Sequence, residues 1–288
     1  MKYLYGFRLL DSARQFITSA VSYAKARDSS EWKFAVVHLA IALELLLKAR
    51  LVVEDPKLLA AKGSNLSEAD LESGDFRSVT IEEALRCLKR LGLRLSGAQR
   101  TALDAVSHLR NRLIHYAARE DRDRFIAVLA SGLNLFFEIE FSEFRDVESY
   151  GAKTQSELIT ELGELKAFVQ GRLSSLEAQL ASSKRPRTHH FDECSDCLQD
   201  TTIITDEGLH CLFCRRTISI RDYAELASQD GSVEVRPECK RESIVKRQWG
   251  DRQPTFECFC CGYFRGPEIS WSNGKRTIPR LHSDRLAQ

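Results

Sequence analysis

The segment HLRNRLIHYA, residues 108–117, holds three polar side chains in an R-N-x-x-x-H arrangement: Arg110, Asn111 and His115. An imidazole with an ordinary pKa can take or give a proton near neutral pH. Arginine presents a rigid fork of hydrogen-bond donors to phosphoryl oxygens, and an asparagine amide can orient an imidazole one helical turn away. These residue types together suit acid–base chemistry on a phosphate ester.

The surrounding sequence predicts that these residues lie on one helix. At about 100° per residue, four polar residues share one side of it: Asp104, His108, Asn111 and His115. The apolar residues fall on the other side: Leu103, Val106, Leu109, Leu113 and Ile114. Arg110 lies towards the apolar side, where an unpaired guanidinium is costly, so we expect it to have a carboxylate partner or a bound anion.

A candidate carboxylate comes from the segment FAVVHLAIALELLLKARL, residues 34–51, which is apolar on all sides. Such a pattern predicts the buried central helix of a bundle. Glu44 is its conspicuous internal charge. The sequence allows either a Glu44–Arg110 pair or a Glu44–Lys48 pair at i,i+4.

Hydrophobic periodicity predicts five helices up to about residue 150, at residues 11–27, 31–53, 81–93, 97–117 and 121–144. Thr80 with Glu83, and Ser96 with Gln99, have the spacing of capping boxes. The polar segment 54–79 predicts a long loop with at most a short helical turn, either surface padding or a binding loop.

A further long helix is predicted at residues 155–182, opened by the capping-box pair Thr154 and Glu157. Its apolar residues recur at steps of three and four, as in a coiled coil: Leu158, Leu162, Leu165, Val169, Leu173, Leu176 and Leu180. The helix could pair with a second copy or lie against the bundle. A polar linker containing proline follows at residues 182–190.

The run from Arg110 to His115 resembles the R-x(4 to 6)-H motif of the HEPN superfamily, and ALELLLKARL, with Glu44 and Lys48, is similar to the second helix of many members. The resemblance covers about the first 150 residues and implies a dimeric all-α bundle with two motifs in a shared cleft. Many members are metal-independent endoribonucleases of toxin–antitoxin, abortive-infection or antiviral systems, and others only bind. Many also have Tyr two residues after the His, whereas here Tyr116 follows directly.

The resemblance implies that Arg110, Asn111 and His115 are catalytic, and we add four supporting residues: Glu44, Lys48, His108 and Tyr116. The RNA 2′-hydroxyl would attack the neighbouring phosphate and leave a cyclic phosphate, without a catalytic metal. The expected partners are an RNA substrate, a second copy of the chain, and an antitoxin or defence-system component. The alternative is a non-catalytic dimeric adaptor that binds nucleic acid or protein.

Two cysteine pairs, Cys194-x2-Cys197 and Cys211-x2-Cys214, are separated by 13 residues with a β-branched run and the turn sequence Asp-Glu-Gly at 206–208. This pattern resembles a zinc ribbon, in which a hairpin joins two knuckles and four thiolates close the coordination sphere. We therefore expect one structural Zn²⁺. A redox dithiol is the alternative.

A second, incomplete ribbon is predicted from RPECKRESIV and FECFCCGYF, where Arg236 takes the place of the first cysteine. Cys239, Cys258 and Cys261 would remain as ligands, with Cys260, His282 or nothing as the fourth, so filled and metal-free ribbons both stay open. Basic pairs between aromatic residues in this region suit either RNA contact or a solvated surface, and ribbons also bind proteins.

The 288 residues carry a formal charge of +1, so charge predicts neither nucleic-acid nor membrane affinity. The start lacks a signal-peptide pattern, the most apolar run is too short to span a bilayer, and eight of nine cysteines lie between Cys194 and Cys261. We expect a cytoplasmic protein. Its predicted parts are an all-α helical bundle (1–150), a long coiled-coil-like helix (151–183), a β-rich zinc ribbon (184–225) and a degenerate ribbon (226–288).

Overall fold

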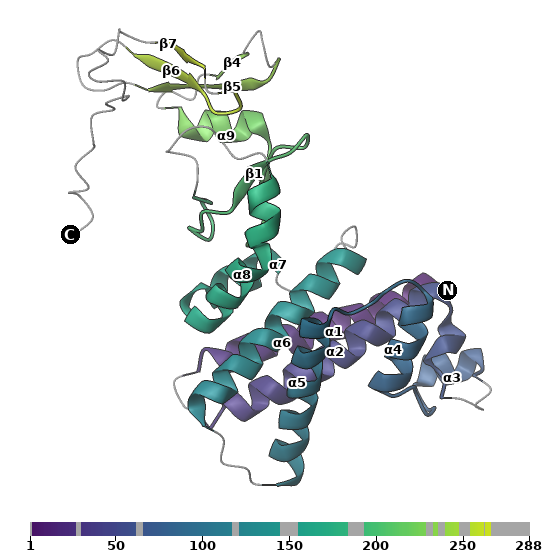
Figure 1. Cartoon of the computed structure of the whole chain (residues 1–288). Coiled ribbons are helices and arrows are strands. Elements are labelled where there is room, and N and C mark those ends of the chain that lie inside the picture. The colour runs from purple at the N-terminus through teal and green to yellow at the C-terminus, as the bar shows by residue number, and fades with distance from the viewer. Residues whose placement is uncertain are drawn as a thin grey trace. The chain divides into compact units, whose positions relative to one another are not determined.

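The structure is a computed structural model. It describes residues 2–26, 30–61, 66–116, 121–144, 155–183, 193–228, 233–235, 240–247, 254–261 and 263–265. The chain divides into two compact units, Met1–Ala178 and Gln179–Gln288. The first is helical and the second contains small antiparallel sheets (Figure 1). This division confirms the predicted fold class, a helical bundle followed by small β-rich parts.

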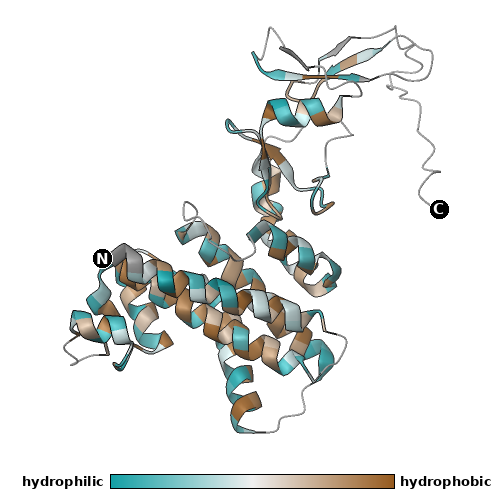
Figure 2. Cartoon of the chain, turned by 180° about the vertical axis from the view of Figure 1, so that it is seen from behind, coloured by the Kyte–Doolittle hydropathy of each residue, from teal (hydrophilic) through white to brown (hydrophobic). Residues whose placement is uncertain are grey.

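Four long helices form most of the helical unit: α1 (Lys2–Ala24), α2 (Trp32–Glu54), α5 (Gly97–His115) and α6 (Arg122–Glu143). Helix α2 is the central one, because it packs against α1, α4, α5 and α6 and has buried residues along its whole length. Figure 2 shows hydrophobic residues along the long helices of this unit. The all-round apolar pattern of residues 34–51 thus correctly predicted a buried helix.

The helix starts follow the predicted capping boxes. Helix α4 (Ile81–Arg90) begins after Thr80, whose hydroxyl accepts the N–H of Glu83 while the Glu83 carboxylate accepts the N–H of Thr80. Ser96 and Gln99 form the same reciprocal pair at the start of α5. Each box satisfies backbone donors that the first helical turn leaves unpaired.

Residues 54–79 hold more structure than the predicted loop. A short 3-10 helix, η1 (Pro56–Leu59), follows α2, and α3 (Glu68–Ser73) follows further along. An antiparallel bridge joins Ala60 to Ser78 and brings the two ends of the segment together. The predicted single turn is therefore two short helices.

The predicted continuous helix 155–182 is wrong in its middle. The structure has α7 (Gln155–Glu161), a short 3-10 turn η2 (Leu162–Glu164) and α8 (Lys166–Ser182). Gly163 lies in the turn, and Leu165 takes an extended backbone (φ −85°, ψ 91°) that ends it. Thr154, the predicted N-cap, lies outside the described residues.

This segment lies against the bundle, which was one of the two predicted alternatives. The ring of Phe168 meets the ring of Phe137 at 6.2 Å, and the Gln155 amide donates to the Phe137 carbonyl at 2.8 Å. The buried side chains differ in part from the predicted seam: Leu158, Ile159, Leu162, Phe168, Arg172 and Leu176. The seam that could have paired with a second copy is therefore partly used within the chain.

Within the described residues, one helix is long and apolar enough to cross a membrane by length and composition, and this helix is α6. More than half of its most apolar window, 56%, is buried inside the structure. A core helix of a bundle has the same properties. Leu133, Phe136 and Phe137 of α6 are fully buried in the helical unit.

The second unit contains two antiparallel sheets. The first has the order β1 (Thr202–Ile204), β2 (Leu209–Cys211), β3 (Thr217–Ile218), and its turn requires Gly208, where a Cβ would lie 2.1 Å from the Ile218 carbonyl oxygen. This hairpin matches the one predicted between the two cysteine pairs.

Helix α9 (Ile220–Ala227), which the sequence reading did not predict, leads to the second sheet. That sheet has the order β4-β5-β6-β7, with these bounds: Val233–Val235, Glu242–Arg247, Thr255–Cys258 and Phe264–Arg265. Ile204 and Leu209 of the first sheet share one hydrophobic core with Ala224 of α9 and with Ile244 and Val245 of the second sheet.

Candidate functional site

The R-N-x-x-x-H motif lies in the last two turns of α5, which runs without interruption to His115. Leu103, Val106 and Leu109 are buried, as predicted for the apolar side. Beyond them the helix is exposed: it projects past the other helices of its unit (Figure 1), and Ile114 and Tyr116 are 48% and 73% exposed. The predicted apolar side therefore faces solvent over the final turn.

Arg110 and Asn111 contact each other, since the Arg110 guanidinium donates to the Asn111 amide oxygen at 2.9 Å. Arg110 is half-buried, whereas Asn111 and His115 are exposed. Among the residues that the structure describes, Arg110 has no carboxylate partner and His115 has no hydrogen-bond partner. Of the two expected partners of Arg110, the carboxylate is thus absent from the described part of the chain.

Glu44 pairs with Lys48 and not with Arg110. The Lys48 ammonium lies 2.5 Å from a Glu44 carboxylate oxygen and donates to the Ser78 hydroxyl at 2.9 Å. Lys48 is 8% exposed, so these two contacts satisfy a nearly buried charge. Ser78 was missed because no spacing rule connects it with a lysine thirty residues earlier. Glu44 and Lys48 therefore have a structural explanation that does not involve the motif.

The other two supporting residues, His108 and Tyr116, are both exposed. Tyr116 is the C-cap of α5, and its backbone N–H bonds to the Arg112 carbonyl at 2.9 Å. Its side chain is therefore presented at the tip of the helix next to His115. His108 lies about two turns before His115 on the same polar side.

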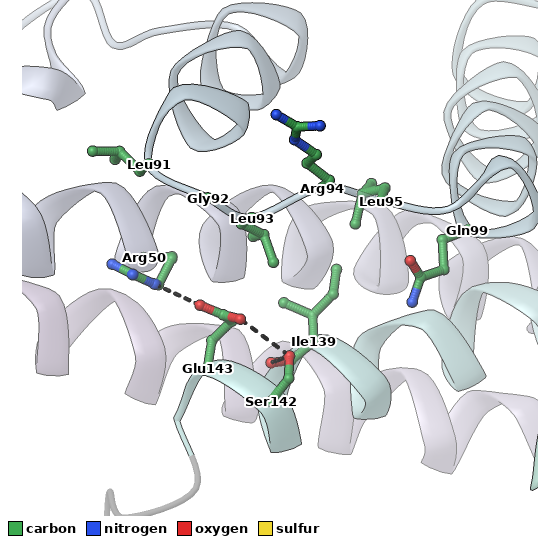
Figure 3. Close-up of a pocket in the computed structure, with 10 residues that line it drawn as sticks. All are labelled: Arg50, Leu91, Gly92, Leu93, Arg94, Leu95, Gln99, Ile139, Ser142 and Glu143. Atoms are coloured by element: carbon green, nitrogen blue, oxygen red, sulfur yellow. Dashed lines mark hydrogen bonds and ion pairs between the residues drawn. The ribbon is translucent and has the colours of Figure 1, made fainter. Parts of the chain in front are cut away.

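A pocket of ≈ 490 Å³ lies elsewhere in the helical unit, between α2, the loop before α5 and the end of α6 (Figure 3). Arg50 lines it, but its guanidinium is already bound to Glu143 at 2.7 Å and to Glu54 at 2.6 Å. Gln99, also in the lining, lies about 24 Å along α5 from His115, at about 1.5 Å per residue. No motif residue lines this pocket.

The four cysteines of the first ribbon come together as predicted. Cys194 and Cys214 have their sulfur atoms 3.6 Å apart, as do Cys197 and Cys211, and all four lie within 4.8 Å of one another. Four thiolates at about 2.3 Å from one tetrahedral ion lie about 3.8 Å apart, whereas a disulfide bond is about 2.05 Å long. The geometry fits one closed, structural zinc site and no disulfide.

The thiols of this cluster hydrogen-bond to one another, and these contacts shift their pKa values in opposite directions. A hydrogen bond from Cys197 holds the pKa of Cys194 down to about 7. Hydrogen bonding with Cys194 lowers the pKa of Cys211 and raises the pKa of Cys197. Zinc binds cysteine side chains as deprotonated thiolates. Its binding to this cluster would therefore release the protons that the thiols still hold.

The second cysteine group is only partly described. Cys258 and Cys261 have their sulfur atoms 3.3 Å apart. A hydrogen bond with Cys260, followed by burial, raises the pKa of Cys258 to about 12. Arg236, Cys239 and His282 lie outside the described residues.

Two of the basic residues proposed for RNA contact already have partners. Arg241 donates to the Thr205 carbonyl and to the Asp206 carboxylate, both at 3.2 Å, and Arg216 lies 3.4 Å from an Asp196 carboxylate oxygen. These contacts tie the loops of the ribbon unit together. They favour the reading of these two residues as parts of an ordinary solvated surface.

No protein-family model matches the chain, and no curated protein or solved structure is significantly similar to it. The chain thus carries two candidate sites. One is the exposed polar end of α5 in the helical unit, and the other is the four-cysteine cluster of the β unit, which resembles a zinc ribbon.

Proposed function

We propose that the helical unit is a metal-independent endoribonuclease of the HEPN type. One observation carries the proposal: Arg110, without a carboxylate partner among the described residues, lies on the same exposed helix end as Asn111 and His115. A cation, an amide and an imidazole at a solvent-facing helix end contribute little to the packing of the helix. They do suit a polyanionic substrate that approaches from solvent.

In the proposed reaction, His115 removes the proton from a ribose 2′-hydroxyl, and the resulting oxygen attacks the adjacent phosphorus. The bond to the 5′-oxygen breaks, that oxygen leaves as a hydroxyl after it takes a proton from water, and the His115 imidazolium returns its proton to water. Arg110 stabilises the charge on the phosphoryl oxygens, and Asn111, which binds Arg110, fixes the direction of the guanidinium. The products are a 2′,3′-cyclic phosphate and a 5′-hydroxyl.

We further propose that the chain works as a homodimer in the cytoplasm, as an effector of a toxin–antitoxin or antiviral system, with the zinc-ribbon unit recognising RNA or a partner protein. The exposed Ile114 and Tyr116 beside the motif offer apolar surface to a second copy. The zinc ion would hold the ribbon loops in place and would take no part in catalysis, since four thiolates leave no open coordination position.

The experiment is incubation of the full chain with total RNA in EDTA, followed by sequencing of the cut ends. We expect cleavage that ends in cyclic phosphates, and its loss in His115→Ala and Arg110→Ala. Arg8→Ala, at an exposed arginine of α1, is the matched control and should cut normally. An RNA with a single 2′-deoxy residue at the cut site should survive. Products ending in 3′-hydroxyls, or cleavage abolished by EDTA while zinc content and helical signal persist, would reject this mechanism.

One observation favours a second function, a non-catalytic dimeric adaptor. The motif lies at an exposed helix end, and none of its residues lines the pocket between α2 and the end of α6, as binding alone would permit. An adaptor would bind RNA or protein without cutting, and Arg110→Ala would weaken binding without any change in the integrity of the RNA. The cleavage assay and a binding assay on the same variants separate the two functions.

A further inference from the structure

The two sheets of the C-terminal unit repeat one arrangement. In the first, the Cys194–Cys197 pair precedes β1, Cys211 is the last residue of β2, and Cys214 lies between β2 and β3. In the second, Cys239 precedes β5 in the sequence, Cys258 is the last residue of β6, and Cys261 lies between β6 and β7. Both have three antiparallel strands in sequential order, β1-β2-β3 and β5-β6-β7, and the second adds β4 at its edge.

The side-chain environment of one cysteine also repeats, at Cys211 in the first sheet and at Cys258 in the second. In the first sheet the Thr201 hydroxyl lies 3.1 Å from the sulfur of Cys211. In the second the Ser243 hydroxyl lies 3.1 Å from the sulfur of Cys258. Thr201 comes four residues after Cys197, and Ser243 comes four residues after Cys239. A hydroxyl that bonds a sulfur at this position supports a thiolate, so the second sheet keeps a feature that a mere core cysteine does not need.

The backbone agrees residue by residue. Cys211 donates its N–H to the carbonyl five residues later at 2.9 Å, and Cys258 does the same at 2.8 Å. Each also lies opposite the first matching strand residue, with Thr202 paired to Cys211 and Ile244 paired to Cys258. The residue after the first knuckle has a positive φ in both sheets, 58° at Leu198 and 52° at Lys240. Residues other than glycine rarely adopt a positive φ, so the surrounding structure must hold the backbone in this conformation at both positions.

This correspondence assigns each cysteine of the second group. Cys258 matches Cys211, and Cys261 matches Cys214. Cys260 matches Phe213: both are at most 1% exposed, and Cys260 belongs to the hydrophobic core of the unit. By sequence spacing from Ser243, Cys239 corresponds to Cys197, which leaves Arg236 at the position of Cys194.

We propose that the C-terminal unit is a tandem of two zinc ribbons, and that the second binds its own zinc ion through the thiolates of Cys239, Cys258 and Cys261. Because Arg236 replaces the fourth cysteine, a water molecule or another small ligand completes the coordination of this ion. Cys260 is a core residue and not a ligand. This inference is independent of the proposed ribonuclease activity, since it concerns the ribbon unit alone.

The decisive measurement is the zinc content of the full chain, purified without chelator and normalised to protein by amino-acid analysis. We expect two zinc ions per chain. Cys261→Ser should retain one, Cys211→Ser should also retain one, and the double variant should retain none. Cys260→Ala is the matched control and should retain two, because it alters the residue next to a ligand without removing one.

The wild-type ratio needs no variant, so a variant that fails to fold does not obscure the answer. One zinc ion per wild-type chain would overturn the second site. Two ions with one lost in Cys260→Ala would overturn the ligand assignment. The open fourth position is tested by chelator kinetics: we expect one ion to leave quickly and the other slowly, and Arg236→Cys to slow the fast phase. Two equally slow ions in the wild type would overturn the open position.

Discussion

Glu140 of α6 and Arg14 of α1 form a buried ion pair that joins two helices distant in the sequence. The Arg14 guanidinium lies 2.7 Å from a Glu140 carboxylate oxygen, and the side chains are 11% and 7% exposed. Burial raises the pKa of the Glu140 carboxyl, although the hydrogen bond and charge of Arg14 oppose the shift. The desolvation of the carboxylate thus outweighs the attraction of its partner, as is common for buried pairs.

The sign of the pH dependence follows from this raised pKa. The folded chain holds a proton on Glu140 at a pH where the unfolded chain has released it, so the folded state binds more protons in that range. The stability that Glu140 contributes is fully present below its unfolded pKa. It is lost as the pH rises through the folded pKa.

We predict that Arg14→Met lowers the free energy of unfolding by about 3–5 kcal/mol at about pH 7, because it leaves a buried carboxylate unpaired. The loss should be smaller at about pH 5, since the pKa of Glu140 rises further without Arg14 and the neutral acid is cheaper to bury. Urea unfolding at the two pH values measures both effects. The double variant Arg14→Met, Glu140→Leu should recover most of the loss; a double variant as unstable as the single one would contradict the ion-pair explanation.

At this scale the sequence predicted the interactions that depend on short spacing. The capping boxes at Thr80 and Ser96 and the four-cysteine cluster all have their partners at fixed short offsets or in a recognised pattern. For Glu44 the sequence allowed either Arg110 or Lys48 as the partner, and the structure shows Lys48. The Arg14–Glu140 pair and the Lys48–Ser78 bond were not predicted, because they join residues 126 and 30 positions apart that only tertiary packing brings together. The charged Glu140 in an apolar helix was the available signal for the first of these.

Helices α2, α5 and α6 approach one another closely at Gly132. A Cβ added there would lie 2.5 Å from the Val106 side chain of α5 and 2.8 Å from the Leu39 side chain of α2. Real Cβ atoms do not make contacts this short, so neighbouring side chains or whole helices would have to move. The absence of a side chain at this one position therefore sets how closely the three helices pack.

We predict that Gly132→Ala lowers the free energy of unfolding by about 1–3 kcal/mol through overpacking, despite the better helix propensity of alanine. The control is Gly97→Ala in the first turn of α5, where a Cβ would meet nothing within 4 Å. It should leave stability unchanged or raise it by up to about 1 kcal/mol. Chemical denaturation of both variants measures the difference, and equal stability of the two would show that the packing at Gly132 adapts freely.

The elements themselves were predicted best where a single helix is long and its pattern regular. The five predicted helices before residue 150 correspond to α1, α2, α4, α5 and α6, although α1 begins at Lys2, nine residues before the predicted start at residue 11. The break at Gly163 was missed because the apolar steps continue through it, and the turn is stabilised by Leu162, which is buried against the rest of the unit. Helix α9 was missed because it has only eight residues, although Ser219 caps it by accepting the N–H of Asp222.

On the scale of the whole molecule, the change from helical to strand-like periodicity near residue 183 predicted the main division, and the structure places it after Ala178. The finer division into four domains remains a prediction. The assembly of two chains into a dimer also remains a prediction, because amino-acid composition does not indicate whether a chain dimerises. Of the two alternatives for the helix at 155–182, pairing with a second copy is not open to Leu158 and Leu176, since both side chains are buried within the helical unit.

The remaining argument for a dimer comes from α5. Residues five positions apart on a helix point about 140° away from each other, so Arg110 and His115 of one chain diverge and cannot easily hold the same phosphate. A two-fold axis beside the end of α5 would bring Arg110 of one chain towards His115 of the other, because a two-fold interface uses the same surface twice. The exposed Ile114 and Tyr116 would then be covered in the interface.

We predict that Arg110→Ala and His115→Ala chains, each inactive alone, recover ribonuclease activity when they are mixed and allowed to exchange subunits. The heterodimer would contain one site with both residues intact and one with neither, so activity should approach about half that of the wild type per dimer, as site counting in a two-fold assembly requires. Differently tagged chains allow the heterodimer to be purified before the assay. Ile114→Asp should weaken dimerisation and activity together in sedimentation and cleavage measurements. A purified heterodimer without activity, or an active protein that sediments as a monomer at assay concentration, would exclude a shared site.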